Sequence, residues 1–461
     1  MKNTTIHNNR LVYYYCLIVV WVALILSGYG CTKHYYTATA QLPLPKQNAD
    51  IAAKLANKMQ KTQPTAATTT TSSSSNFLDN WALYAPDTQR LWLTPPRLVR
   101  VNVHLVNNTD STKNFTQQTG REFVKRLIFY VNYRWSKNTK MNLPEGGNKT
   151  PVLPILIQFE LAGQTNQAKN EEGIYFHAND SLYWFNKKDK SLYSKTLFET
   201  YGVNKDSVLN IFLIEHHPDS IKSRTYKASN DGIGYTNHVK LANSYHAYLK
   251  LLNANDPNAL ENTAAEASSL LCHELGHSLG LWHTWNTNDG CDDTPQHTQC
   301  WNWDVCPDHA PSNNYMDYTA LREALTPCQL GRMHANFTNP NSPQRKYTQP
   351  NWCNQNPNET VTIYAGDTLR LNRFVDMPRD IVIAKNGCLI LQNAHLNMPP
   401  NSKILVQPGG TLLLYGSTIT CLCPNQTWRG IEVKNGIFKK EKLRILKPAT
   451  LKNIANRPRS K

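Results

Sequence analysis

The sequence predicts an α/β (α+β) domain with a small sheet, followed by a partial right-handed parallel β-solenoid. Three observations support this fold class. Strand-like and helix-like segments alternate between about residues 77 and 350. Within that region, the stretch HELGHSLGLWHTW gathers three histidines and one glutamate. After about residue 350, short apolar segments recur with glycines between them.

The first domain, predicted at 77–350, is expected to begin with a strand at 100–106, where apolar residues alternate with polar ones. Residues 120–135 have apolar side chains at helical spacing. Further strands are predicted at 155–161 and 209–215. A second helix, at 263–280, carries the histidine-rich stretch.

Solenoid coils are predicted at 351–436. Apolar strands begin at Ile381, Ile404 and Ile431, so they recur about every 25 residues with a glycine at each turn. Each coil of such a fold buries its apolar face only against a neighbouring coil. The basic segment 437–461 is expected to be a solvated tail. Either the natural chain is truncated here or this segment is a frayed end.

The chain has a formal net charge of +16. Because much of that charge lies in the basic tail, we expect a solvated segment rather than a nucleic-acid surface.

Residues 1–31 resemble an export signal, with Lys2 and Arg10 before an apolar run. The run ends in SGYGC, which resembles a bacterial lipoprotein signal with Cys31 as the lipidated residue. Gly28 stands where such signals usually have leucine. The alternatives are an uncleaved signal anchor and a plain secretory signal. Each predicts an exported protein: a cell-surface or outer-membrane lipoprotein, or a secreted one.

Residues 32–76 are predicted to be a low-complexity linker, since their composition cannot bury enough apolar area to fold. A tether that holds the folded part away from a membrane is one interpretation, and a latency segment is the other.

Cysteine usage agrees with export. Four of the eleven cysteines crowd the segment after the histidines: Cys291, Cys300, Cys306 and Cys328. In an oxidising compartment these predict disulfides that hold long loops, with a pairing that the sequence does not give. Cys272, inside an apolar helix, is expected to be a free thiol.

The histidine spacing is that of metal ligands. His273 and His277 are four residues apart, so they project from one face of a helix and suit a tetrahedral zinc ion. Glu274 is placed beside them to take a proton from water at the metal. Gly280 can adopt a positive φ, end the helix and turn the chain so that His283 joins the other two ligands.

Three histidines leave one zinc position open, as a catalytic site requires. The alternative is a cluster of core histidines, each with its own hydrogen-bond partner. That alternative gives Glu274 no use, and we therefore expect a catalytic zinc.

The motif HExxHxxGxxH resembles that of the metzincin metallopeptidases, and NNYMDY at 313–318 resembles their later tight turn. The resemblance implies a metzincin-type catalytic domain with a zinc-binding active-site helix. It also implies that Met316 forms an apolar floor beneath the metal. Tyr318 matches a tyrosine that stabilises the oxyanion of the intermediate. A tyrosine that merely packs in the turn is the alternative.

Two further segments resemble the pappalysin, or cytophagalysin, family: DGCDDTPQ at 289–296 and LTPCQLGRMH at 325–334. Cys328 stands where many relatives have glycine, so the disulfides can differ. Some family members bind calcium, and Asp292 and Asp293 are candidate Ca²⁺ ligands. The alternative is that these aspartates cap turns and position the loop.

The sequence therefore predicts an extracytoplasmic zinc metalloendopeptidase that hydrolyses peptide bonds. Zn²⁺ is the expected cofactor, with Ca²⁺ as a further candidate. The expected partners are a protein or peptide substrate and a membrane, through the signal or a lipid anchor, and no nucleic acid. The alternative is a surface adhesion or structural protein whose solenoid carries the function and whose protease domain is ancillary.

Overall fold

In the computed structural model, the described residues are 77–143, 149–164, 172–185, 194–222, 231–285, 289–296, 311–356, 359–434 and 442–455. All of them belong to one compact unit. The predicted signal, Cys31 and the linker at 32–76 lie outside these ranges, as do Cys300 and Cys306. Within the same ranges, no helix has both the length and the apolar character that crossing a membrane requires.

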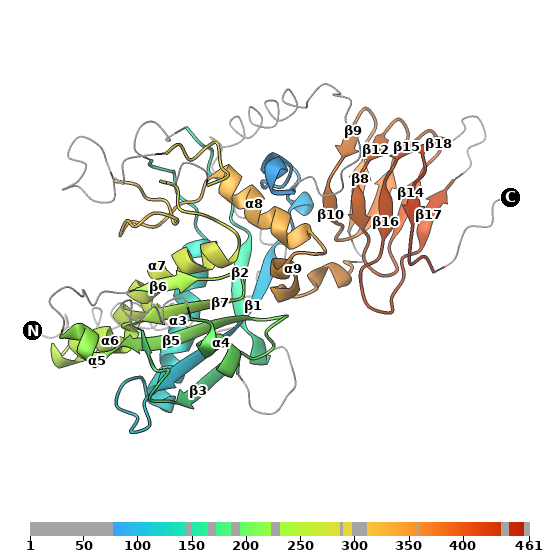
Figure 1. Ribbon diagram of the computed structural model, residues 1–461. Helices are drawn as coiled ribbons and strands as arrows, with labels where there is room; N and C mark the ends of the chain where they lie inside the picture. The colour runs from blue at the N-terminus through green and yellow to red at the C-terminus, as the bar shows by residue number, and fades with distance from the viewer. Residues whose placement is uncertain are drawn as a thin grey trace, which may run out of the picture. The chain divides into compact units, whose positions relative to one another are not determined.

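A seven-stranded sheet forms the centre of the first domain (Figure 1). Its main strand order is β2-β1-β5-β7-β6, while β3 pairs with β1 and β4 pairs with β5. All pairings are parallel except that of β6 with β7, so β6 is an antiparallel edge strand. The strands are β1 Arg97–Asn107, β2 Ile157–Leu161, β3 Ile174–Ala178, β4 Trp184–Phe185, β5 Leu209–His216, β6 Gly232–Gly234 and β7 His238–Ala242.

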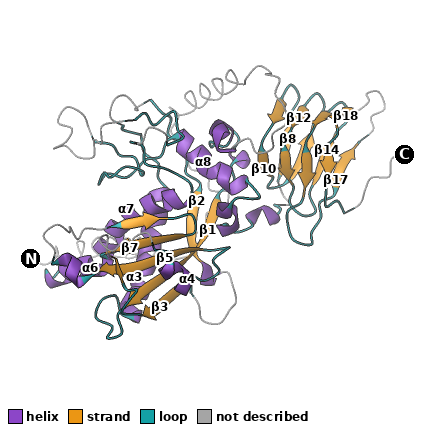
Figure 2. Ribbon diagram, viewed as in Figure 1, coloured by secondary structure: helices purple, strands orange, loops and turns teal. Residues whose placement is uncertain are grey.

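Helices cover the sheet because their apolar faces bury against it (Figure 2). The long helices α3 and α7 pack together over β1 and β5, and Val101, Leu127 and Leu271 are fully buried between them. On another part of the sheet, α4 packs Leu197 and Phe198 against Phe212 of β5. The helices are α3 Gln117–Trp135, α4 Thr196–Tyr201, α5 Pro218–Ile221, α6 Ser244–Asn253, α7 Ala259–Ser278, α8 Pro327–Thr338 and α9 Pro343–Tyr347.

The predicted strands at 100–106, 155–161 and 209–215 correspond to β1, β2 and β5, and the two predicted helices to α3 and α7. Four strands were not predicted. β4 has only two residues, and β6 is the sequence Gly-Ile-Gly, which has no apolar alternation. Such strands exist through pairing with a neighbour rather than through local propensity.

The C-terminal part consists of three four-stranded parallel sheets, as a solenoid requires. Its interior rows pair in register: Ile381 with Ile404, and Ile404 with Ile431. The strands are β8 Thr360–Ile363, β9 Thr368–Leu371, β10 Phe374–Asp376, β11 Asp380–Ile383, β12 Cys388–Gln392, β13 His395–Asn397, β14 Lys403–Val406, β15 Thr411–Tyr415, β16 Thr418–Thr420, β17 Gly430–Val433, β18 Lys442–Lys447 and β19 Thr450–Leu451.

The predicted basic tail differs from the structure over its described residues. β18 pairs with β15 and β19 pairs with β16, so this segment adds a coil to the solenoid instead of fraying. The backbone ladder does not depend on side-chain charge, and the basic side chains can stay solvated while Leu443 pairs with Leu412. The basic composition of this segment therefore gave no signal for strands β18 and β19.

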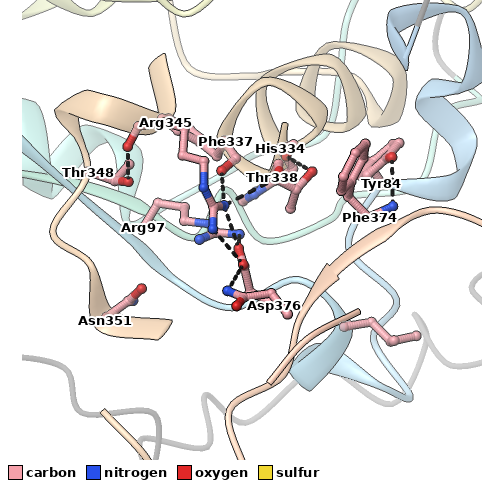
Figure 3. Close-up of polar contacts among 12 residues, drawn as sticks. Tyr84, Arg97, His334, Phe337, Thr338, Arg345, Thr348, Asn351, Phe374 and Asp376 are labelled. Atoms are coloured by element: carbon pink, nitrogen blue, oxygen red, sulfur yellow. Dashed lines mark hydrogen bonds and ion pairs between the residues drawn. The ribbon is translucent and has the colours of Figure 1, made fainter. Parts of the chain in front are cut away.

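A buried ionic cluster joins the first domain to the solenoid (Figure 3). Asp376 of β10 accepts hydrogen bonds from Arg97 at the start of β1 (2.8 Å), from Arg345 of α9 (2.8 Å, bidentate) and from Asn397 (2.7 Å). The guanidinium of Arg345 also lies 4.0 Å from the ring centroid of Trp352. Burial alone would raise the pKa of Asp376, but Arg345 and Arg97 hold it well below its usual range.

Candidate metal centre

The three histidines of the motif converge on one point. His273 and His277 lie on successive turns of α7, and His283 follows the end of that helix. The Nε2 atom of His273 lies 3.2 Å from those of His277 and His283, and the last two atoms are 3.0 Å apart. The three side chains form a cluster that could hold a metal ion.

Backbone carbonyls orient two of these imidazoles. Nδ1 of His273 lies 2.7 Å from the Tyr315 carbonyl, and Nδ1 of His277 lies 2.9 Å from the Leu281 carbonyl. A carbonyl only accepts hydrogen bonds, so Nδ1 donates its proton in both cases. Each Nε2 therefore presents a lone pair to the centre of the cluster.

Burial lowers the pKa of all three imidazoles, that of His283 to about 3. They are therefore neutral at neutral pH, and an acceptor-only centre needs a cation. In a tetrahedral zinc site with Zn–N bonds of about 2.0–2.1 Å, ligand nitrogens lie about 3.3 Å apart. The observed separations are close to this value, so the donor set fits zinc.

Gly280 makes the bend that brings His283 to the other two. α7 ends at Ser278, and Gly280 has a φ of 100°, as its place in the motif predicts. A Cβ atom on Gly280 would lie 2.5 Å from Nδ2 of Asn336. That amide donates a hydrogen bond to the Leu279 carbonyl (2.9 Å) and thereby satisfies the helix end.

Met316 lies beneath the cluster and is fully buried. Its sulfur packs against Gly276, between the first two histidines, where a Cβ atom would collide with it. Asn314 holds the turn: its Oδ1 accepts from the Met316 amide (2.8 Å), and its Nδ2 donates to Gln329 of α8 (2.8 Å). The predicted turn and the 325–334 segment thus act as one support.

Glu274 is 4% exposed and lies against the edge strand β6. A Cβ atom on Gly232 would lie 2.7 Å from its Oε1, so this approach requires glycine. Burial raises the pKa of Glu274 to about 8, while Arg322 and the backbone N–H of Gly234 act to lower it. A zinc cation at the histidines would favour the carboxylate further.

A peptidase family described as "Pregnancy-associated plasma protein-A" matches residues 206–338. This segment contains the histidine cluster, Glu274 and the Met316 turn. The domain is a metzincin-type zinc metalloendopeptidase. Among curated proteins, none matches the chain.

Two solved structures resemble parts of this metallopeptidase chain. One is mirolysin in complex with compound 9, at 18% identity and a TM-score of 0.37, covering 56% of this chain and 99% of that one. The other is mature mirolysin from Tannerella forsythia in complex with a cleaved peptide. It is 20% identical with a TM-score of 0.38, and the match covers 55% of this chain and 99% of that one.

Tyr318 lies beside the metal centre of the metallopeptidase domain and is 52% exposed. Its ring centroid is 5.0 Å from that of His283 and 5.8 Å from that of His273. Trp285 stacks on His283 with ring centroids 4.0 Å apart and also contacts Tyr318. The tyrosine therefore packs on the histidines of the cluster while part of it reaches solvent.

Asp317 is a support that the sequence patterns did not reveal. It is fully buried and accepts hydrogen bonds from the hydroxyls of Thr284 and Ser312. Thr284 follows His283 directly, so Asp317 ties the third histidine of the cluster to the turn that carries Met316. No local motif signals this pairing, because its partners are separated by 33 residues.

Arg322, which follows the Met316 turn, was also missed. Its Nε donates to the Asp317 carbonyl (3.0 Å), and its charge acts on Glu274, His273 and His283. An arginine in a segment of mixed composition carries no spacing signal, so only the fold places it here.

The predicted acidic pair has two different environments. Asp292 is exposed, whereas Asp293 accepts a hydrogen bond from the Cys328 amide (2.9 Å) in the first turn of α8. Burial raises the pKa of Asp293 to about 6. Asp293 also lies near the sulfurs of Cys291 and Cys328, but these form a disulfide and therefore supply no thiolate to a metal.

The other cysteines follow the sequence prediction in part. Cys272 is a buried free thiol, as expected, and Cys388 and Cys421 are also free. A second disulfide, Cys353–Cys423, joins the segment before the solenoid to the coil after β16.

Proposed function

We propose that this chain is an extracytoplasmic endopeptidase in which His273, His277 and His283 hold the catalytic zinc and Glu274 is the general base. The observation that carries the proposal is that the three Nε2 lone pairs converge on one point. Glu274 directly follows the first of these histidines, His273, in helix α7. No other cluster of three metal ligands with free donor atoms occurs among the described residues.

When bound, zinc supplies a Lewis acid that makes water a nucleophile near neutral pH and polarises the scissile carbonyl. Glu274 then accepts the proton of the attacking water and passes it to the leaving amine. Burial opposes ionisation of this carboxylate, whereas Arg322 and the Gly234 N–H favour its ionised form. Tyr318, partly exposed beside the ligands, donates a hydrogen bond to the developing oxyanion.

The substrate of this site is an extended peptide. β6 is the edge of the sheet and packs directly on Glu274 through Gly232. A free strand edge offers backbone donors and acceptors to an added strand. A peptide paired with β6 would therefore pass in front of the general base.

The remaining predictions complete the proposal. Residues 1–31 direct export, with Cys31 as a lipid anchor or with release by secretion. The right-handed winding of the solenoid and the domain limits before residue 437 are kept as predicted, whereas residues 442–451 are assigned to the solenoid instead of the tail. For Asp292 and Asp293, turn positioning accounts for the Asp293 contact, and calcium binding stays a prediction that a calcium titration of the purified protein tests.

Glu274→Gln tests the mechanism. We expect it to retain zinc but to lose about 10²- to 10⁴-fold in kcat on a peptide library, because the general base is gone. Glu266→Gln is the matched control, since Glu266 is exposed on the same helix. Unchanged hydrolysis in Glu274→Gln, or hydrolysis that survives removal of the metal by a chelator, would contradict the proposal. The adhesion alternative predicts a function that is indifferent to both changes.

A further inference from the structure

Arg322 brings a positive charge into the metal centre that no carboxylate neutralises by contact. Among the described residues, it makes one hydrogen bond, from Nε to the Asp317 carbonyl (3.0 Å), and no ion pair within 4.0 Å. Asp317 itself is occupied by the hydroxyls of Thr284 and Ser312.

The two terminal nitrogens of Arg322 reach solvent. They make no hydrogen bond to a described residue and are not fully buried. This differs from Arg97, whose Nη1 is buried without a partner. The half-buried guanidinium of Arg322 therefore has two unpaired terminal nitrogens, while its Nε is fixed.

The position of this fork is set relative to the reacting groups. The backbone of Glu323 and Ala324 is bonded to Asn313, so the segment is held against the Met316 turn. Burial lowers the pKa of Arg322, and the charges of Glu274 and Tyr318 are among those that act to raise it. Arg322 is bonded to Asp317, and Asp317 is bonded to Thr284 beside His283, so the guanidinium is held at the Met316 turn next to the histidine cluster. A partly exposed guanidinium at this position can meet substrate side chains.

We propose that Arg322 is a specificity-determining residue that binds a carboxylate of the peptide substrate next to the scissile bond. The inference rests on the proposed peptidase function. A guanidinium pairs with carboxylates in a bidentate geometry, and with one nitrogen already fixed it loses little freedom on binding. The carboxylate belongs either to an Asp or Glu side chain or to the C-terminus of a short peptide.

The test measures kcat/KM on matched peptides that differ only near the cleaved bond. One pair contrasts Glu with Gln in an internally cleaved peptide with an amidated end, and a second pair contrasts a free with an amidated C-terminus. We expect the wild-type enzyme to prefer one carboxylate-bearing peptide by about tenfold or more, as charged hydrogen bonds allow. The pair that shows the preference identifies the source of the carboxylate.

Arg322→Gln is expected to remove this preference, and Arg322→Lys to keep part of it. Arg370→Gln is the control, because Arg370 is exposed on β9 and its guanidinium also bonds one neutral acceptor, Gln392 (2.9 Å). Thermal unfolding checks that each variant is folded. If Arg322→Gln does not fold, the wild-type comparison of Glu and Gln peptides still decides whether the site prefers a carboxylate.

The outcomes separate the two claims. A wild-type enzyme that cleaves peptides without any carboxylate preference overturns the role of Arg322 alone. The role of Arg322 is also overturned if Arg322→Gln loses kcat/KM equally on charged and neutral peptides, because Arg322 would then act only through Glu274. A wild-type protein that cleaves nothing overturns the proposed function and this inference together.

Discussion

The ionic cluster around Asp376 and the histidine cluster around His273 both lie largely in the interior, and they are built in opposite ways. Around Asp376, both carboxylate oxygens are occupied by donors from Arg97, Arg345 and Asn397. Around His273, three imidazole acceptors face one another with no donor between them. The first cluster contains its own counterions, whereas the second requires a cation from outside.

The comparison teaches how to distinguish a structural from a functional polar cluster. A buried carboxylate whose two oxygens are both occupied fixes one arrangement of the chain and has no acceptor left for a ligand. Converging lone pairs would be unfavourable without a ligand, and the fold holds them together through Met316, Asp317 and Gly280. Removing a residue from either cluster should therefore have different consequences.

The largest stability effect is expected for Asp376→Ala. It leaves two buried guanidinium groups without their anion, which costs about 3–5 kcal/mol in the free energy of unfolding. Urea denaturation measures this loss. Asp380→Ala, a partly exposed carboxylate four residues later, is the control. A loss below about 1 kcal/mol in Asp376→Ala would show that the cluster does not hold the two parts together.

Acid should weaken the Asp376 cluster in a defined range. The folded pKa of Asp376 is held below its unfolded value of about 3.9, so its contribution is complete above that value. It is lost as the pH falls through the folded pKa. Stability measured from pH 5 to pH 2 should decrease more steeply in the wild-type protein than in Asp376→Asn. Parallel curves would remove Asp376 from the acid response.

Gly280→Ala tests whether the bend after α7 holds the histidine cluster together. Alanine disfavours a φ of 100°, and its Cβ would press on Asn336, so we expect a loss of about 1–3 kcal/mol in stability. Because the bend positions His283, zinc affinity should also fall. Gly366→Ala, also at positive φ but with open space around its Cβ, separates backbone strain from the steric effect. Equal zinc affinity in Gly280→Ala and the wild type would contradict the role of the bend.

The smallest effect is expected for Met316→Leu. Both side chains are apolar and similar in volume, so the exchange should cost less than about 1.5 kcal/mol and leave the zinc content unchanged. Metal analysis and thermal unfolding check both values. Loss of zinc in this variant would mean that the sulfur does more than fill the space under Gly276.

The sequence predicted the local features of the metal centre better than the contacts that distant residues make with it. The positive φ of Gly280 and the helix at 263–280 follow from spacing within a short segment, and the turn at Met316 follows from the resemblance of NNYMDY to the metzincin turn. Arg322 and Asp317 could not be found in this way, since their partners are distant in the chain. The same holds for Arg97 and Asp376, which are separated by 279 positions.

Fold prediction was limited for a similar reason. Long strands with apolar alternation, such as β1 and β5, were evident, whereas β6 depends on pairing with β7 and on glycine contacts with Glu274. In the solenoid, the basic side chains of β18 obscured a strand whose backbone pairs with β15. Pairing between distant segments leaves little trace in local composition.

The central claim, that the three histidines form a zinc site, is tested most directly by metal analysis of the purified protein. We expect about one zinc ion per chain in the wild type and none in His277→Ala. A folded Asp376→Asn variant should keep its zinc, because its cluster has no part in metal binding. A folded wild-type protein that cleaves peptides without stoichiometric zinc, or a His277→Ala variant that keeps it, would contradict the claim.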